Sequence, residues 1–269
     1  MTRIAVIGAA GRMGRALLRL VLADPDMTLG AAIVSEHSGL TGEDAAQLVG
    51  LPPSGVRLTS QLGAALGAAD VAVDFSSAAS AETNLLECVA AAKPLLLGTT
   101  GFAPTLESQF GAAAGRIALL VAPNTSVGIT MLLELVRTAA AGLSADFDIE
   151  IFEAHHRAKR DAPSGTALAL GAAAAAARGL ELQAARVSHE AATGAPRPGQ
   201  IGFASLRAGD IVGEHQVWFA GPGERLSLSH QATDRAVFAR GALKAAVWLA
   251  AQPAGRYFMR DFVLAKSSA

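Results

Sequence analysis

The sequence is poor in several residue types, and each shortage excludes a class of protein. Cys88 is the only cysteine among 269 residues, so no intramolecular disulfide can form and an oxidising compartment is not implied. We interpret Cys88 as a small buried residue on a helix. Charged residues make up 17 % of the chain, below the average of about 25 %. Its 22 basic and 23 acidic residues nearly cancel, so the basic excess of a general nucleic-acid binder is missing.

The sequence also lacks a long apolar run. Its N-terminus enters a strand-like run at Arg3, without the basic and apolar regions of a signal peptide. The longest uncharged helical run, residues 165–177, is mostly alanine and is shorter than the roughly 20 apolar residues of a membrane span. We therefore expect a soluble, cytoplasmic protein with no membrane and no nucleic-acid partner.

The first 125 residues alternate between short apolar runs and helical patterns. The apolar runs are 3–8, 29–34, 71–75, 94–98 and 117–122. Continuous apolar strands separated by helices are typical of a parallel sheet that is covered on both faces. The pattern predicts a doubly wound α/β domain.

After residue 124 the pattern changes. We expect a helix over 127–143, and then an alternating strand in which Phe147, Ile149 and Ile151 are separated by acids. An alanine-rich helix over 166–178 and three strand-like runs follow. The fold class is therefore α/β, a Rossmann-like doubly wound parallel sheet domain plus a smaller α+β mixed-sheet substrate domain. We place the dinucleotide-binding domain at 1–126, completed by a closing helix within 236–269, and the substrate domain at 127–235.

A glycine-rich loop joins the first strand to a helix. The segment G-A-A-G-R-M-G places Gly8, Gly11 and Gly14 where a helix N-terminus offers free N–H groups to a diphosphate. Position 10 is alanine, so the spacing is G-x-x-G-x-x-G instead of G-x-G-x-x-G. The motif favours dinucleotide binding, and the alternative is a structural glycine turn.

Other loops follow strand ends at the same predicted edge. They are G-T-T-G at 98–101 and A-P-N-T-S at 122–126, which suit a ribose and a nicotinamide, although they are also compatible with plain turns. The second strand ends in Val34 and Ser35, and Glu36, the only acid nearby, comes two positions later than the acid expected at the strand end. Because an acid at the strand end favours NADH and a basic or small polar residue tolerates NADPH, the cofactor preference stays open.

The densest group of charges is E-A-H-H-R-A-K-R-D-A-P-S-G-T-A at 153–167. Lys159 follows His155 by four residues, so one helical turn would put both proton donors on one face. Ser164 is positioned to cap the next helix, and the N–H groups of Gly165 and Thr166 then form a second anion site, for a carboxylate.

Several polar residues have a plainer interpretation. Asp161 is typical of a cap or turn. Adjacent histidines without a cysteine partner or an H-E-x-x-H motif do not predict zinc, so we expect no metal. Two groups remain: Arg157 and Arg160 as solvated or paired cations, and His37, His189, His215 and His230 as lone histidines with structural or surface roles.

With these motifs in place, the sequence strongly resembles the dihydrodipicolinate reductase family of bacterial lysine and diaminopimelate synthesis. The matching segments, in order along nearly the whole chain, are G-A-A-G-R-M-G-R, D-F-S, G-T-T-G-F, A-P-N-T-S-V-G, E-A-H-H-R-A-K-R-D-A-P-S-G-T-A, R-A-G-D-I-V-G-E-H and M-R-D-F. The resemblance implies reduction of a small dicarboxylate with NADH or NADPH. It also implies a homotetramer built through the sheet of the second domain.

The resemblance also implies roles for single residues. His155 would be the proton donor and Lys159 a second donor, while His156, Gly165 and Thr166 would hold the substrate carboxylates. Arg235 would approach the substrate. The family often has Glu-Arg where this chain has Val34-Ser35, so the ribose contact differs. The implied cofactor contacts are Gly8, Ala9, Ala10, Gly11, Arg12, Met13, Ser35, Gly98, Thr99, Thr100, Ala122, Pro123, Asn124 and Thr125.

Two other functions remain open at this point. A nicotinamide-dependent dehydrogenase of an amino acid or a sugar would share the loop at 8–14 but would not need the stretch at 153–167. A nucleotide sensor without catalysis would not need a histidine and a lysine as proton donors.

Overall fold

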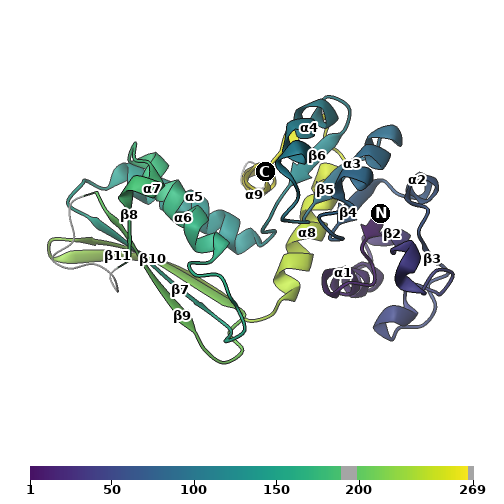
Figure 1. The fold of residues 1–269 in the computed structure, drawn as a ribbon, viewed down its shortest axis with the longest axis horizontal. Helices are drawn as coiled ribbons and strands as arrows, with labels where there is room; N and C mark the ends of the chain where they lie inside the picture. Colours follow the sequence, from purple (N-terminus) through teal and green to yellow (C-terminus); the bar gives the residue numbers. More distant parts are fainter. Residues whose placement is uncertain (189–198, 266–269) are drawn as a thin grey trace. The chain divides into compact units, whose positions relative to one another are not determined.

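A computed structural model describes residues 1–188 and 199–265. These residues form two compact units, one of Met1–Ser126 with Ala236–Ala269 and one of Val127–Arg235 (Figure 1). His189 and most of the loop expected at 194–200 lie outside the described residues. Within the described ranges, no helix is both long and apolar enough to cross a membrane.

Parallel strands make up the sheet of the first unit. They are β1 (Thr2–Ile7), β2 (Met27–Ile33), β3 (Leu58–Thr59), β4 (Val71–Asp74), β5 (Leu95–Leu97), β6 (Ala118–Val121) and β12 (Gly255–Tyr257). Across the described part of the unit, the spatial order is β12-β6-β5-β4-β1-β2-β3. The chain moves outward from β1 in one direction and from β4 in the other, so the strand order reverses between them. Ligands of open α/β sheets bind at such a point.

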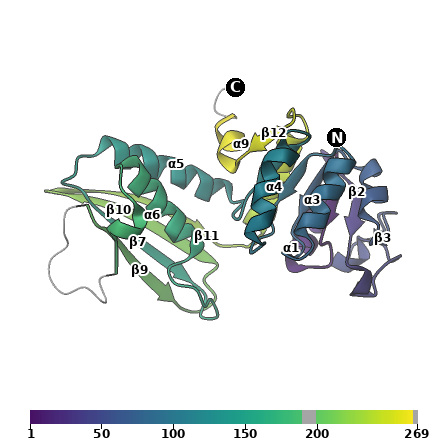
Figure 2. The ribbon, with the colours of Figure 1, turned by 45° about the horizontal axis from the view of Figure 1, so that its top comes forward.

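Helices cover both faces of this sheet (Figure 2). On one face α1 (Arg12–Ala23) packs beside α8 (Ala236–Leu249), which the apolar face of the closing helix predicted. The helices of the other face are α2 (Leu62–Ala65), α3 (Ala81–Ala90) and α4 (Pro104–Ala114). Cys88 is fully buried on α3. The remaining short elements are η1 (Glu36–Ser38), η2 (Gln47–Val49), η3 (Leu66–Ala68) and α9 (Met259–Ala265).

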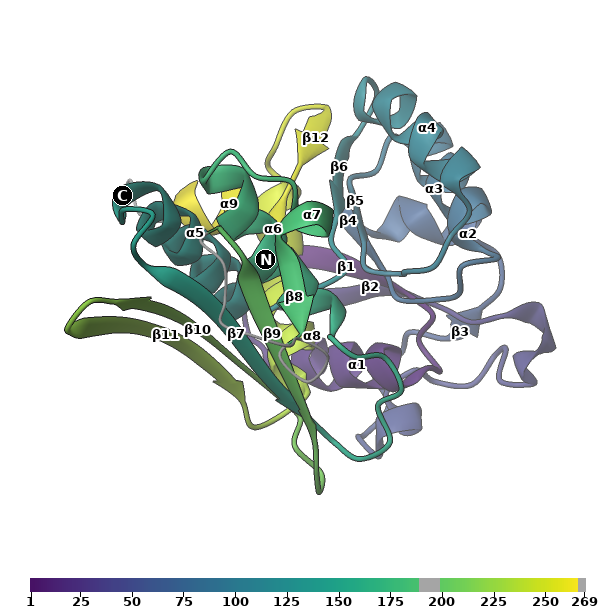
Figure 3. The same cartoon turned by 60° about the vertical axis from the view of Figure 1, so that its left-hand side comes forward.

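The second unit is a mixed sheet with helices on one face (Figure 3). Its strands are β7 (Asp148–His155), β8 (Arg186–Ser188), β9 (Ile201–Arg207), β10 (Gly213–Gly221) and β11 (Glu224–Ala232), and its helices are α5 (Val127–Gly142), α6 (Gly165–Ala177) and α7 (Leu182–Ala185). The described strands lie in the order β11-β10-β7-β9-β8. β7 is central, parallel to β9 and antiparallel to β10. The predicted fold class is therefore confirmed.

The alternation along β7 decides which residues face the helices. Ile149 and Ile151 are buried in the core under α5 and α6, whereas Phe152 points to the opposite face and is 39 % exposed. The strand starts at Asp148 because Phe147 closes a turn onto the Ser144 carbonyl. The same period of two continues beyond Ile151 and places Glu153 and His155 on the helix-covered face.

Candidate functional site

The glycine loop of the first unit leads into α1 with its main chain accessible. Gly11 is the N-cap and α1 begins at Arg12, so the N–H groups of Arg12, Met13 and Gly14 have no acceptor inside the helix. Glycine is required at two positions of this loop. Gly8 has a φ of +82°, and a Cβ on Gly14 would lie 2.1 Å from the Gly8 carbonyl oxygen. The result is an anion site made of main-chain groups.

Hydrogen bonds to neighbouring segments hold the glycine loop in place. The N–H groups of Gly8 and Ala9 both donate to the carbonyl of Ile33 at the end of β2, over 3.0 and 2.9 Å. The Arg15 guanidinium donates to the carbonyls of Ala10 at 3.0 Å and Leu48 at 2.6 Å. No sequence pattern pointed to Arg15, because its acceptors are main-chain carbonyls, one of them in a distant loop.

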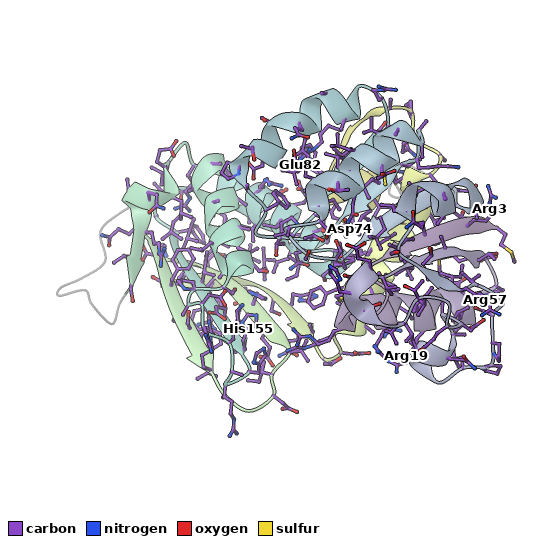
Figure 4. All side chains as sticks on the ribbon, turned by 45° about the vertical axis from the view of Figure 1, so that its right-hand side comes forward. Arg3, Arg19, Arg57, Asp74, Glu82 and His155 are labelled. Atoms are coloured by element: carbon purple, nitrogen blue, oxygen red, sulfur yellow. The ribbon has the colours of Figure 1, made fainter. Side chains whose placement is uncertain are left out.

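A buried carboxylate connects the next two loops. Asp74 is labelled in Figure 4 and ends β4. It accepts hydrogen bonds from Ser76 N–H at 2.7 Å, Asn84 Nδ2 at 2.9 Å and Thr99 Oγ1 at 3.2 Å. Burial raises the pKa of Asp74, while these hydrogen bonds oppose the rise. Asp74 therefore fixes the G-T-T-G loop relative to the loop after β4. The D-F-S motif contains this residue, but its sequence does not predict the role of Asp74.

Two cavities lie over the loops of the first unit. A cleft of about 1140 Å³ lies over the point where the strand order reverses, and Gly8, Ala10, Gly11 and Ser35 line it. A second cavity of about 770 Å³ is lined by Thr99, Thr100 and Pro123, together with Arg256 and Phe258, which the sequence did not single out.

The other predicted cofactor residues differ in exposure. Ala9, Ala122 and Thr125 are buried, and the Thr125 hydroxyl donates to the Phe238 carbonyl at 2.7 Å, so it anchors its loop to α8. Asn124 accepts from the Ser126 N–H at 2.9 Å. At Gly98, a Cβ would lie 2.3 Å from the Phe75 ring, so a larger residue there would require this ring to move.

In the second unit, strand register brings together polar residues that are far apart in sequence. Glu153 on β7 lies opposite His215 on β10 and Ser205 on β9, and His155 lies opposite Arg207. All of these belong to the helix-covered face, at the end of β7 that precedes α6. In Figure 4, His155 lies on the sheet of this unit.

Glu153 is the centre of this cluster and is fully buried. Its carboxylate lies 2.5 Å from His155 Nδ1, accepts from the Arg207 guanidinium at 2.6 and 2.9 Å, and accepts from Ser164 N–H at 3.3 Å. Burial alone would raise the pKa of Glu153, but the hydrogen bonds from Arg207, Ser205 and His155 outweigh it and hold the pKa below its usual range. Glu153 is therefore an anion paired with two possible cations.

His155 and His215 form a pair with different environments. Burial lowers the pKa of His155, Lys159 and Arg207 lower it further, and Glu153 opposes them. The two rings lie 5.1 Å apart, and His215 Nε2 is 3.1 Å from Ser164 Oγ. Burial and the nearby His155 lower the pKa of His215 to about 4, so His215 is neutral at neutral pH. His215 is therefore not a lone histidine, because it contacts His155 and Ser164, while its predicted structural role stays a prediction. Its register on β10 could not be derived from the sequence.

The start of α6 completes the site. Ser164 caps the helix as predicted, because its Oγ accepts from the Ala167 N–H at 3.1 Å. The first bond inside the helix runs from the Leu168 N–H to the Ser164 carbonyl, so the helix offers no acceptor to the Gly165 N–H. Thr166 is the next residue of α6.

The segment before α6 is a turn and not a helix, which corrects the helical turn considered for His155 and Lys159. The turn is closed by the Lys159 N–H on the His156 carbonyl at 3.0 Å. Lys159 pairs with Asp161 at 2.9 Å, and its charge is still close enough to lower the pKa of His155.

The remaining polar residues of the segment lie at its surface. His156 is half-buried, whereas Arg157 and Arg160 are exposed. Arg235, at the end of the second unit, is also exposed. Among the described residues, no group of three His, Cys, Asp or Glu side chains is arranged to hold a metal ion.

Family models match both units. The model "Dihydrodipicolinate reductase, N-terminus" matches residues 2–125, and "Dihydrodipicolinate reductase, C-terminus" matches residues 128–263. The chain belongs to the dihydrodipicolinate reductase family. A relative from Anaeromyxobacter sp. (strain Fw109-5) is 46 % identical over 269 residues and covers 100 % of both chains. One from Thiobacillus denitrificans is 48 % identical over 260 residues, 96 % of this chain and 97 % of the relative. Both relatives are named 4-hydroxy-tetrahydrodipicolinate reductase.

Solved structures show the same fold. A dihydrodipicolinate reductase from Paenisporosarcina sp. TG-14, with dipicolinate bound, superposes with a TM-score of 0.78 at 24 % identity, over 96 % of this chain and 97 % of that chain. A myo-inositol dehydrogenase from Corynebacterium glutamicum superposes with a TM-score of 0.61 at 14 % identity, over 99 % and 94 %. The names of the relatives identify the family as oxidoreductases. The two-unit fold also occurs in the myo-inositol dehydrogenase.

Proposed function

We propose that the chain reduces 4-hydroxy-tetrahydrodipicolinate to tetrahydrodipicolinate with NADH or NADPH, in lysine and diaminopimelate synthesis. The observation that carries this proposal is the 46 % identity to a reductase of that name over all 269 residues. A cytoplasmic location is part of the proposal, since the reaction belongs to biosynthetic metabolism.

The first unit has the groups that a nicotinamide dinucleotide requires. The helix start at Arg12 and Met13 would bind the diphosphate, and the strand end at Ser35 would face a ribose. The 4-hydroxyl would leave as water together with a ring proton, which gives a conjugated dihydro ring. When bound, the nicotinamide would supply a hydride to C4 of that ring, and one proton completes the reduction. The proposed contacts remain Gly8, Ala9, Ala10, Gly11, Arg12, Met13, Ser35, Gly98, Thr99, Thr100, Ala122, Pro123, Asn124 and Thr125.

His155 is the proposed proton donor to the nitrogen side of the ring, where negative charge develops as C4 accepts the hydride. Its Nδ1 faces Glu153 at 2.5 Å, so Nε2 is the nitrogen that remains for the substrate. Burial lowers the pKa of His155 in the free protein, which disfavours its protonated form. A dianionic substrate nearby would raise that pKa and so favour the protonated donor when it is needed.

The two substrate carboxylates would be held by the groups around the start of α6. His156 and the N–H groups of Gly165 and Thr166 would bind them, and Lys159 would add positive charge and act as a second donor. Glu153 is a positioning residue in this scheme, because it orients His155 without touching the substrate.

The test is an assay with the freshly made aldehyde–pyruvate condensation product, with NADH and NADPH in parallel. We expect oxidation of the cofactor only when this substrate is present. His155→Gln should lower kcat by about 100-fold or more. Arg160→Gln changes an exposed cation of the same segment and is the matched control, with kcat expected to stay within about twofold. Full activity in His155→Gln would remove its role as donor, and no oxidation by the unmodified protein would reject the substrate.

A homotetramer through the second sheet is the proposed assembly. Among the described residues of this unit, the helices pack on one face of the sheet, and the opposite face carries Phe152 and Leu206, which are 39 % and 44 % exposed. Trp218 shares this face, with the Arg225 guanidinium 4.3 Å from its ring centroid. Light scattering should give the mass of four chains, and Phe152→Glu should reduce it. A monomer at micromolar concentration would contradict the assembly.

A further inference from the structure

The residues that line the cleft of the first unit bear on the choice between NADH and NADPH. The Ile33 carbonyl accepts hydrogen bonds from both Gly8 and Ala9, so the end of β2 is fixed directly beside the phosphate loop. A ribose joined to a diphosphate at that loop therefore falls against the residues that follow Ile33. Those residues, Val34 and Ser35, line the cleft together with η1.

The charges around this position are acidic. Among the residues that line the cleft, the charged or titratable side chains are Glu36, His37 and Glu87, and neither lysine nor arginine is present in that described set. Glu36 is 75 % exposed, 3.5 Å from His37 Nε2. A 2′-phosphate would add roughly two negative charges next to Glu36, without a guanidinium or ammonium group from the cleft wall.

The arginines nearby are used elsewhere or lie outside the wall. Arg15 is bound to the carbonyls of Ala10 and Leu48, and Arg57 donates to the Gly42 carbonyl at 2.7 Å. Arg12 is exposed at the start of α1, at the diphosphate end, and does not line the cleft.

A 2′-hydroxyl fits the same surroundings. The Ser35 hydroxyl lies at the strand end, where it accepts from the His37 N–H at 3.3 Å and still has a proton to donate. The Glu36 carboxylate is an acceptor, and no lysine or arginine stands among the described residues that line the cleft beside it. Hydroxyl and carboxylate together suit an uncharged ribose edge.

We propose that this chain prefers NADH over NADPH, with Glu36 as the residue that discriminates against the 2′-phosphate. The inference rests on the proposed use of a nicotinamide cofactor. Because Glu36 is exposed, its effect is mostly a screened charge repulsion, and we expect roughly tenfold tighter binding of NADH at low salt. The ratio should shrink as ionic strength rises.

The test is direct titration of the intact protein with NADH and with NADPH, followed by nicotinamide fluorescence, without substrate. Glu36→Gln should tighten NADPH binding by about threefold to tenfold and leave NADH within about twofold. Ser35→Arg should reverse the preference, because it supplies a cation at the ribose. Glu43→Gln removes an exposed acid of the same unit that does not line the cleft, and it should leave both affinities unchanged.

Equal or tighter binding of NADPH by the unmodified protein would overturn the inference, as would an unchanged ratio in Glu36→Gln. Binding of neither cofactor would overturn both this inference and the cofactor part of the proposed function. Preferential NADH binding without reduction of the condensation product would support the inference and reject the proposed substrate, so the two failures are distinguishable.

Discussion

The two units build their candidate sites from different parts of the chain. In the first unit the groups at the glycine loop are main-chain N–H groups, and glycines at 8 and 14 let the backbone approach itself closely. In the second unit the groups are ionisable side chains around the buried Glu153. A main-chain site is sensitive to added atoms and nearly insensitive to pH. A side-chain site depends on which groups carry protons, so it tolerates changes of volume better than changes of charge.

The largest effect is expected where the main-chain site loses its geometry. In Gly14→Ala the new Cβ would lie 2.1 Å from the Gly8 carbonyl oxygen and 2.6 Å from Ala9 Cα, so the backbone has to move. We expect cofactor binding to weaken by about 100-fold or more, and unfolding to require several kcal/mol less, roughly the cost of overpacking a core. Fluorescence titration and thermal unfolding measure the two effects.

Gly67→Ala is the control for this change, because a Cβ at Gly67 meets no described atom within 4 Å. It should bind cofactor like the unmodified protein. If Gly14→Ala also bound cofactor like the unmodified protein, the close approach of the glycine loop and α1 would not be needed for binding. The first unit would then not be more sensitive to added atoms than the second.

The charge at Glu153 should matter more than its volume. Glu153→Gln keeps the size but leaves Arg207 without its anion and His155 without the group that raises its pKa. We expect kcat to fall by roughly 30-fold, and the free energy of unfolding to fall by about 3 kcal/mol, as when one partner of a buried ion pair is removed. The pKa of His155, followed by NMR, should be lower than in the unmodified protein.

Arg207→Met is expected to shift the pKa of His155 in the direction opposite to Glu153→Gln. Because Arg207 lowers the pKa of His155, its removal should raise that pKa. A donor must be protonated, so the decline of kcat with rising pH should move to lower pH in Glu153→Gln and to higher pH in Arg207→Met. Shifts in the same direction would show that the cluster acts through packing and not through charge.

Stability should depend on pH through His215. Its folded pKa of about 4 is below the unfolded value of about 6.5. The unfolded chain therefore binds more protons between these values, and stability falls as the pH drops from about 6.5 towards 4, by at most about 3 kcal/mol for this group. His215→Asn should flatten that part of the curve. His37→Asn, which changes a histidine whose side chain is 87 % exposed, should not. Parallel curves for all three proteins would contradict the lowered pKa.

The comparison also explains what could be predicted from the sequence. The glycine loop is a short-range feature, so its spacing after a strand was enough to place it. Ser164 as a cap is local in the same way. Glu153, Arg207 and His215 meet only through the register of β7, β9 and β10, which no local pattern gives.

A weaker signal for these residues was present. The alternation that placed Ile149 and Ile151 inside continues to Glu153 and His155, and on β10 His215 precedes Val217 and Phe219 with the same period. The strands missed, β3, β8 and β12, are two or three residues long and cannot show any periodicity.

The smallest expected effect concerns the N-cap residues of α1 and α6, which also differ between the two units. α1 has Gly11 as its N-cap and no side chain there, whereas the α6 cap Ser164 bonds Ala167 N–H and lies 3.1 Å from His215. Ser164→Ala should therefore lower the free energy of unfolding by about 1 kcal/mol, the usual loss for a cap. Because the hydroxyl also contacts His215, the double variant with His215→Asn should cost less than the two single variants together. Denaturant unfolding of the four proteins gives this coupling. Strict additivity would mean that Ser164 is only a cap, and that the side-chain network ends at Glu153 and His155.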